Sequence, residues 1–275
     1  MINSFKLLFV FFIGIIAGCC SHTQNFQHTR KIQSNADMVN STVALVHYKD
    51  KHDNIVDAEN KNGIMKVYCS GVWITHNIFL TAAHCVEDIG KPEKQIEEIL
   101  IDQILGLKLP KWDPTGHELY FSTRNDIWDE QTKDYRGSHK GTIIAYYSEY
   151  DLALVQAKVE LNDLQIPMHA VANLAEELEI GSDVKIVGHP GGMWWTFTKG
   201  TISAIHTKVK NPRDETINAI QISAPVWFGN SGGGAFNENG ELVGICSWIR
   251  DIPNTSFFIH PSIIRIVLRE NNIIF

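Results

Sequence analysis

The sequence predicts an all-β protein built from antiparallel barrels. Short apolar or alternating runs, separated by turn-forming residues, recur along the chain, and this pattern favours barrels over a parallel sheet. The 275 residues are 44% hydrophobic, a fraction typical of globular proteins. About 255 residues remain once the first 20 are set aside, which is room for one large β unit or for two small barrels that share a core system.

Residues 1–20 are predicted to be an export signal. Lys6 gives a short basic start, and the apolar segment 7–17 is too short to span a membrane comfortably as a helix. The small residues before Cys19 also fit a lipobox, in which this cysteine is lipidated and attaches the protein to the membrane. The alternative is an ordinary cleaved signal peptide, with Cys19 and Cys20 removed or incidental. The protein is therefore expected to be exported, as a periplasmic or cell-surface lipoprotein or as a secreted protein.

Residues 21–36 are polar with little apolar periodicity, so a flexible tether is expected there. A first barrel is predicted over 37–165, and a second barrel with a short closing helix over 166–275. The expected strands of the first barrel are 39–46, 64–73, 77–80, 142–147 and 152–158, with a helical turn at 82–85. The expected elements of the second are strands 183–187, 201–205, 217–222, 242–248 and 256–259, followed by a helix over 262–270.

Two stretches within the first barrel are predicted to lie outside its strands. Residues 87–117 are interpreted as an insertion, with a surface helix over 91–105 where apolar residues recur near helical spacing. A second polar stretch covers 122–140. Both could shape access to a cleft or merely decorate the surface.

The charge balance argues against a nucleic-acid partner. The formal net charge is −7, and no lysine- or arginine-rich run is present. No His/Glu spacing typical of a zinc site occurs either, so neither a metal nor an organic cofactor is expected.

A serine flanked by glycines marks the main candidate site. Ser231 follows the apolar run 224–228 on a turn rich in glycine, where the backbone can approach a ligand closely. The N–H groups of Gly229 and Ser231 can point into one small space, which could hold a developing oxyanion. The alternative is a glycine-rich turn that happens to contain a serine. The catalytic interpretation requires a base and an acid elsewhere in the chain.

Both partners are present. His84 follows Thr81-Ala82-Ala83, and Asp151 begins the apolar segment 152–158. A serine hydroxyl is a poor nucleophile until a base removes its proton, and an imidazole does this well near neutral pH. A buried carboxylate then orients the imidazole and stabilises its cation. The chain order is His84, Asp151, Ser231.

This order, in these three local contexts, resembles the trypsin-like, chymotrypsin-fold serine proteases over residues 39–267. The run VGHPGG, followed by TFTKGTISA, resembles bacterial members, including the Deg branch. The resemblance implies two six-stranded antiparallel barrels, an active site between them and a short C-terminal helix. It also implies that His84, Asp151 and Ser231 are catalytic and that the amides of Gly229 and Ser231 form the oxyanion hole.

The same resemblance implies a disulfide between Cys69 and Cys85, because relatives often link the strand before the histidine to the residue after it. Export to an oxidising compartment would allow this bond. Cys246 is then left over in an apolar strand, where a small buried thiol is expected.

The resemblance also places the segment 246–249 along the substrate. Ser247 and Trp248 would form a wall of the primary specificity pocket, and Ile249 would narrow this pocket because many relatives have glycine there. The expected preference is for small or medium apolar side chains. An extended peptide could pair with the backbone of this strand.

The sequence therefore predicts an exported serine endopeptidase that acts on polypeptides through an acyl-enzyme intermediate. A non-catalytic binding or scaffold protein on the same fold remains open as an alternative. So does an esterase that uses the same triad, because fold alone does not exclude it.

Overall fold

The computed structural model describes residues 32–56, 63–91, 112–129, 134–211, 214–250 and 252–274. The predicted export signal, the predicted lipidation site Cys19 and nearly all of the helix expected over 91–105 lie outside these residues.

Regular structure begins earlier in the described residues than expected. Helix α1 (Asn35–Asn40) starts at Ser34, whose hydroxyl accepts from the Asp37 amide while the Asp37 carboxylate accepts from the Ser34 amide. Ile32 is only 2% exposed and belongs to a buried cluster with Phe236 of the second barrel. The tether predicted over 21–36 is therefore wrong for residues 32–36, because a capping box and a buried apolar side chain fix them. The strand expected from residue 39 begins at 42, where β1 starts.

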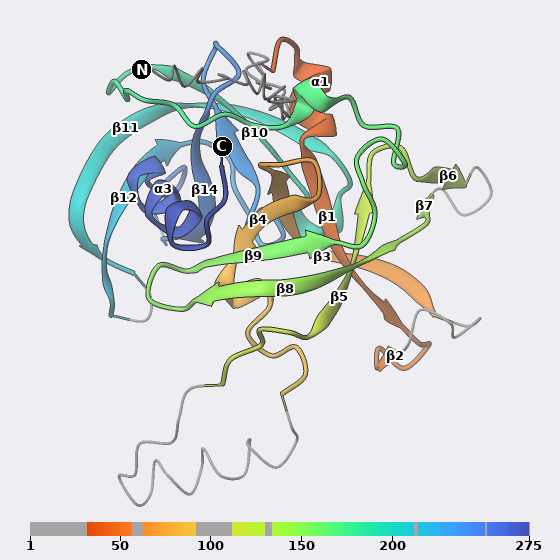
Figure 1. Cartoon of the computed structure of the whole chain (residues 1–275). Helices are drawn as coiled ribbons and strands as arrows, with labels where there is room; N and C mark the ends of the chain where they lie inside the picture. The colour runs from red at the N-terminus through yellow and green to blue at the C-terminus, as the bar shows by residue number, and fades with distance from the viewer. Residues whose placement is uncertain are drawn as a thin grey trace, which may run out of the picture.

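Six antiparallel strands close the first barrel (Figure 1). Their order is β1-β3-β4-β9-β8-β5, with β5 pairing back onto β1. Their bounds are Thr42–Lys49 for β1, Ile64–Trp73 for β3, Ile78–Ala82 for β4, Glu118–Thr123 for β5, His139–Tyr147 for β8 and Leu152–Ala157 for β9. The short strand β2 (Ile55–Val56) extends the sheet beside β1, and β6 (Ile127–Asp129) pairs with β7 (Asp134–Arg136) apart from the barrel.

Strand β5 begins between the two stretches predicted to lie outside the barrel strands, 87–117 and 122–140, and corrects the second, because it continues to residue 123. Leu119 and Phe121 point into the barrel core, and the Phe121 ring makes edge contacts with Trp73 and Phe79. Glu118, the first residue of β5, is exposed, and it pairs with Thr142 of β8. The apolar run 119–121 was present in the sequence, but it is short and joins two polar stretches.

The second barrel is also closed and six-stranded, in the order β10-β11-β12-β15-β14-β13. Its strands are β10 (Asp183–Gly188), β11 (Thr196–Lys210), β12 (Thr216–Ser223), β13 (Gly234–Phe236), β14 (Leu242–Ile249) and β15 (Ser256–Ile259). Helix α3 (Pro261–Glu270) follows β15. The predicted fold class, two six-stranded antiparallel barrels with a short C-terminal helix, is confirmed.

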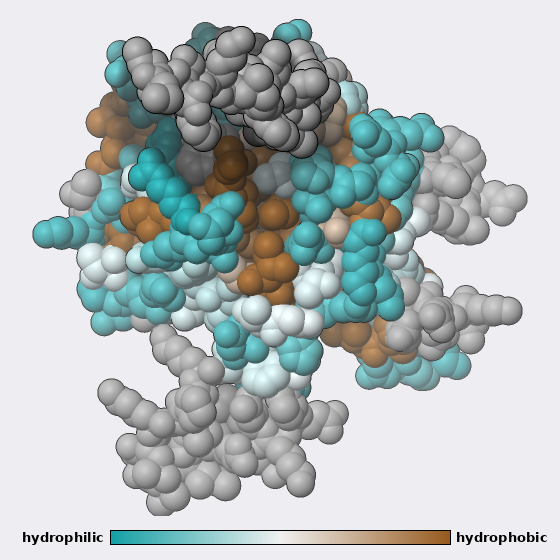
Figure 2. Space-filling model, in the orientation of Figure 1, coloured by the Kyte–Doolittle hydropathy of each residue, from teal (hydrophilic) through white to brown (hydrophobic). Residues whose placement is uncertain are grey.

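One buried apolar cluster joins the barrels to each other and to α3. It contains Leu80 and Leu154 of the first barrel, Val187 and Ile245 of the second, and Ile264 of α3. On α3 itself only Ile266 is an exposed apolar residue, and Figure 2 shows apolar surface interspersed with hydrophilic surface on the face drawn there. Because this cluster contains residues of both barrels, their relative position is fixed by apolar packing as well as by the connection between them.

The connection between the barrels packs onto the first one. Leu164, Ile166 and Val171 belong to the core cluster of the first barrel, and the 3-10 helix η2 (Met168–Ala170) lies within this segment. The first structural unit thus extends past the boundary predicted at 165/166. Within the described ranges, no helix is long and apolar enough to cross a membrane.

Candidate active site

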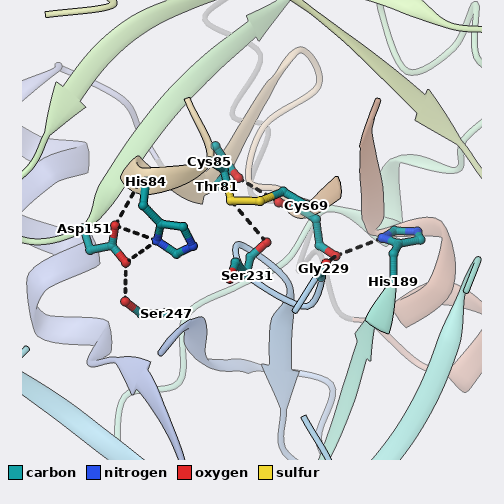
Figure 3. Close-up of a disulfide and its surroundings, with 10 residues drawn as sticks. Cys69, Thr81, His84, Cys85, Asp151, His189, Gly229, Ser231 and Ser247 are labelled. Atoms are coloured by element: carbon teal, nitrogen blue, oxygen red, sulfur yellow. Dashed lines mark hydrogen bonds and ion pairs between the residues drawn. A yellow bond between two sulfur atoms is a disulfide. The ribbon is translucent and has the colours of Figure 1, made fainter. Parts of the chain in front are cut away.

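The predicted triad residues come from three separate elements that meet between the barrels (Figure 3). His84 lies on the 3-10 helix η1 (Ala83–Cys85), directly after β4. Asp151 directly precedes β9, which pairs with β4 so that Ala82 lies opposite Leu152. Ser231 lies on the turn between β12 and β13. Strand pairing therefore brings His84 and Asp151 together although 67 positions separate them.

The His84 ring is held by the Asp151 carboxylate. Nδ1 lies 2.9 Å from Oδ2 and 3.0 Å from Oδ1, and the His84 backbone N–H donates to Oδ1 at 2.9 Å. The Asp151 carbonyl also accepts from the Ala83 amide at 3.0 Å. An acceptor on this side assigns the proton of the neutral ring to Nδ1 and leaves Nε2 free to accept a proton.

Asp151 is only 6% exposed. Burial alone would raise its pKa, but hydrogen bonds from His84 and Ser247 stabilise the charged form and hold the pKa below its usual value. The carboxylate is therefore ionised at neutral pH, as an orienting acid requires.

Ser247 has a role that the sequence interpretation missed. Its hydroxyl donates to Oδ2 of Asp151, across the boundary between the barrels. The interpretation placed Ser247 only in a wall of the specificity pocket. It does line the cleft, but no local pattern in the sequence indicates a contact between residues 96 positions apart.

The turn that carries Ser231 has two backbone amides, those of Gly229 and Ser231, that are available to a ligand. The Phe228 carbonyl accepts from the Gly191 amide at 2.7 Å. In a trans peptide the carbonyl and the next N–H point in opposite directions, so the Gly229 N–H points away from Gly191. Gly229 has a φ of 98°, which favours glycine. Among the described residues, neither the Gly229 amide nor the Ser231 amide has a hydrogen-bond acceptor.

The first barrel also holds the Ser231 turn. The Ser70 amide on β3 donates to the Ser231 carbonyl at 2.8 Å. Cys69, beside Ser70, is joined by a disulfide to Cys85, beside His84 (Figure 3). The pairing implied by the resemblance is the one that the structure contains, and it links the segment that holds the Ser231 turn to the segment that holds His84.

His84 and Ser231 face the same cleft. Figure 3 shows the His84 ring between Asp151 and Ser231. In the described part of the chain, the hydrogen bonds of this ring go to Asp151, and none joins it to the Ser231 hydroxyl. Such contacts are often long before substrate binds and tighten in the complex.

The cleft has a volume of about 910 Å³, and its lining is mostly apolar, although polar residues of the second barrel also line it. Trp227 and Phe228 line it and are 59% and 69% exposed, although the sequence interpretation did not single them out. Trp248 also borders the cleft but is 8% exposed, because it stacks on Phe257 at 4.9 Å between ring centroids. Ile249 lines the cleft and is half-buried.

Cys246 is a free, buried thiol, as expected. Burial, with a smaller contribution from the nearby Asp151 charge, raises its pKa, so the thiol stays protonated. A group of possible metal ligands, Cys69, His84 and Cys85, occurs in the described ranges. Its two sulfurs are joined in the disulfide, so this group does not fit a metal.

A family model described as a trypsin-like peptidase domain matches residues 69–245, more than half of the chain. The chain belongs to this family. The resemblance to trypsin-like proteases that the motifs indicated is thus confirmed, and the matched range includes His84, Asp151 and Ser231.

Several curated proteins are similar to this trypsin-like peptidase. A probable periplasmic serine endoprotease, DegP-like, of Buchnera aphidicola is 35% identical over 107 residues, which are 39% of this chain and 22% of the relative. A probable periplasmic serine protease, do/HhoA-like, of Haemophilus influenzae is 32% identical over 132 residues, 46% of this chain and 27% of the relative. The chloroplastic Protease Do-like 5 of Arabidopsis thaliana is 25% identical over 227 residues, 74% of this chain and 65% of the relative.

The chain thus matches only about a quarter of the length of the two bacterial relatives. Among solved structures, the active form of the Rv3671c protease of M. tuberculosis has a TM-score of 0.55 and 17% identity, over 85% of this chain and 82% of that one. This likeness shows a shared fold.

Proposed function

We propose that this trypsin-like peptidase is a serine endopeptidase that cleaves polypeptides with His84, Asp151 and Ser231. The observation that carries the proposal is the ionised, buried Asp151 bonded to Nδ1 of His84, in the same cleft as Ser231. A carboxylate in this position fixes the ring orientation and stabilises the imidazolium.

In acylation, Nε2 of His84 takes the proton of the Ser231 hydroxyl as Oγ attacks the scissile carbonyl. The carbonyl oxygen becomes an oxyanion and accepts from the amides of Gly229 and Ser231, which have no other acceptor among the described residues. His84 then gives its proton to the leaving amine, the C–N bond breaks, and the acyl group remains on Ser231 as an ester.

In deacylation, a water molecule takes the place of the amine. His84 removes one of its protons while the water oxygen attacks the ester carbonyl, and the oxyanion forms again beside the same amides. The C–O bond to Ser231 breaks, the proton returns to Oγ, and the acid product leaves. These steps need no metal or organic cofactor.

The apolar side of the cleft supports a preference for small or medium apolar side chains. Pro225, Val226 and Ile249 line it, and the acidic residues among the described lining are Glu87 and Asp151. An acidic group that would bind a basic side chain is thus not found beside Pro225 and Val226. Profiling of a peptide library tests this preference, and strong cleavage after Arg or Lys would contradict it.

Export is the second part of the proposal. Residues 1–20 have the composition of an export signal, and relatives in Buchnera aphidicola and Haemophilus influenzae are named as periplasmic. We expect processing before or near Cys19, with lipidation of that residue. Mass spectrometry of the mature N-terminus tests this step, and an unmodified terminus downstream of Cys20 would contradict lipidation.

Labelling with a fluorophosphonate probe tests the activated serine. We expect the wild type to be labelled and Ser231→Ala not to be, with Ser122→Ala, a buried first-barrel serine outside the cleft, labelled like the wild type. Absence of labelling on folded wild type would support a non-catalytic binding protein. Hydrolysis of esters without cleavage of peptides would support an esterase.

A further inference from the structure

A histidine that the proposed reaction does not use is buried behind the Ser231 turn. His189 directly follows β10 and is 0% exposed. Its Nδ1 lies 2.9 Å from the Ser70 hydroxyl, and its ring packs edge-on against Trp195 at 4.6 Å between centroids. Among the described residues, Nε2 has no hydrogen-bond partner.

The contacts of Ser70 settle which atom of His189 carries the proton. The Ser70 hydroxyl lies 2.8 Å from the Gly229 carbonyl oxygen, which can only accept, so the hydroxyl donates its single proton there. Towards His189 it must therefore accept, and Nδ1 must donate. Burial lowers the pKa of His189 to about 3, so the ring is neutral at working pH.

The Gly229 carbonyl belongs to the peptide between the two peptides whose N–H groups would bind the oxyanion. Ser70 donates two hydrogen bonds to this segment, one from its hydroxyl to the Gly229 carbonyl and one from its amide to the Ser231 carbonyl. The preceding peptide is held separately, because its Phe228 carbonyl accepts from the Gly191 amide. The orientation of the peptide that contains the Gly229 carbonyl therefore sets the backbone dihedral angles between the Gly229 N–H and the Ser231 N–H.

We propose that Ser70 and His189 are positioning residues that hold the oxyanion hole in its working geometry. His189 holds the Ser70 hydroxyl, and the hydroxyl holds the Gly229 carbonyl. Because Ser70 lies on β3 and Gly229 on the second barrel, this chain of hydrogen bonds ties the oxyanion hole to the contact between the barrels. The inference rests on the proposed function, since an oxyanion hole matters only if acyl transfer occurs.

Kinetics of three variants test the inference. Ser70→Ala removes the link to Gly229, and His189→Leu removes the donor while keeping an apolar side chain of similar bulk. His189→Asn keeps a donor, because its Nδ2 occupies nearly the position of the histidine Nδ1. For Ser70→Ala and His189→Leu we expect kcat to fall roughly tenfold to hundredfold with KM within about twofold. We expect His189→Asn to retain most of kcat.

A second readout separates positioning from packing. A peptidyl trifluoromethyl ketone forms an oxyanion adduct, so its Ki should rise in Ser70→Ala in parallel with the fall in kcat. Ser122→Ala, a buried first-barrel serine that donates to Asp126, should leave both constants unchanged. If His189→Leu is more active than His189→Asn, or if Ser70→Ala leaves kcat and Ki within twofold of wild type, the inference is overturned.

A third readout does not depend on activity. Long-range ¹⁵N–¹H NMR of the full chain should show His189 as the neutral Nδ1–H tautomer from about pH 5 to pH 8. The Nε2–H tautomer would overturn the inference even in an inactive protein. A wild type that shows the Nδ1–H tautomer but neither labels nor cleaves would instead contradict the proposed function.

Discussion

The two barrels contribute different chemistry to the cleft. The first barrel supplies charged and titratable side chains, His84 and Asp151, held by hydrogen bonds at 2.9–3.0 Å. The second supplies the Ser231 turn, with two amides that have no acceptor among the described residues, and the apolar wall. Each side is completed by a serine of the other barrel, since Ser247 donates to Asp151 and Ser70 donates to Gly229.

This comparison teaches where substitutions should act. On the first-barrel side, the groups are the side chains of His84 and Asp151, so a substitution removes the group itself. On the second-barrel side, the groups are backbone amides, which a substitution reaches only by moving the turn. Ser247 and Ser70 each donate to a residue of the other barrel, so the geometry of the site depends on how the barrels pack.

The first-barrel side should be the more sensitive. Asp151→Asn keeps the shape but cannot hold the same tautomer or stabilise the imidazolium, so kcat should fall by about 10⁴-fold. The matched control, Asp163→Asn on an exposed turn, should leave kcat unchanged. Steady-state cleavage of a peptide substrate measures both, and an Asp151→Asn variant within tenfold of wild type would refute the assigned role.

The second-barrel side should respond through its backbone. In Gly229→Ala, the new Cβ would collide with the His189 carbonyl oxygen, and the residue would be held at a φ of 98°. Losing one oxyanion donor should lower kcat by about 10²–10³-fold. Gly181→Ala is the control, because Gly181 has a φ of 95° with nothing within 4 Å of its Cβ position. An equal fall in kcat in the two variants would show that backbone strain alone causes it, which would contradict a role for the Gly229 amide.

Removing the disulfide tests how far the first-barrel side depends on a covalent link. The Cys69→Ala/Cys85→Ala variant should lose about 3 kcal/mol of free energy of unfolding, because the unfolded chain regains the entropy of a loop that spans 16 positions. Urea unfolding measures this loss. Reductant should destabilise the wild type by a similar amount and leave the variant unaffected; a reductant effect on the variant would contradict the assignment.

Ser247→Ala tests the serine that crosses to Asp151, with the smallest expected effect. A hydrogen bond to a charged group contributes about 1.5–3 kcal/mol, so kcat should fall about tenfold to hundredfold. Ser256→Ala, a buried serine that donates to the neutral carbonyl of Ile222, should have a smaller effect on kcat.

The same variant should also change the acid side of the stability profile. The pKa of Asp151 is lowered in the folded state, so its stabilisation is present above the ordinary carboxyl pKa and is lost as pH falls through the folded value. Without the Ser247 donor, the folded pKa rises towards the ordinary one, and less stability remains to be lost on acidification. Unfolding between pH 2 and pH 5 measures this, and an unchanged profile would refute the contact with Asp151.

Local patterns were sufficient to predict most strands and to single out the three separate motifs that carry His84, Asp151 and Ser231. The predicted strand at 256–259 has the bounds of β15, and His84 lies on the expected helical turn. Short segments with mixed signals were not predicted: β5 joins two polar stretches, and Ile32 is one apolar residue in a polar run.

The supporting contacts of the site could not be predicted because they form only in the folded chain. Ser70 and His189 are 119 positions apart, and Ser247 and Asp151 are 96 apart. Serine and histidine have many possible partners, and only the closure of two barrels decides which ones meet.

A crystal structure of the chain after reaction with a fluorophosphonate would test most directly that the two barrels form one reaction centre. We expect phosphorus bonded to Oγ of Ser231, and the phosphoryl oxygen about 2.7–3.1 Å from the amides of Gly229 and Ser231, with His84 still bonded to Asp151. Attachment to another residue, or a phosphoryl oxygen turned to solvent with both amides unused, would contradict this account.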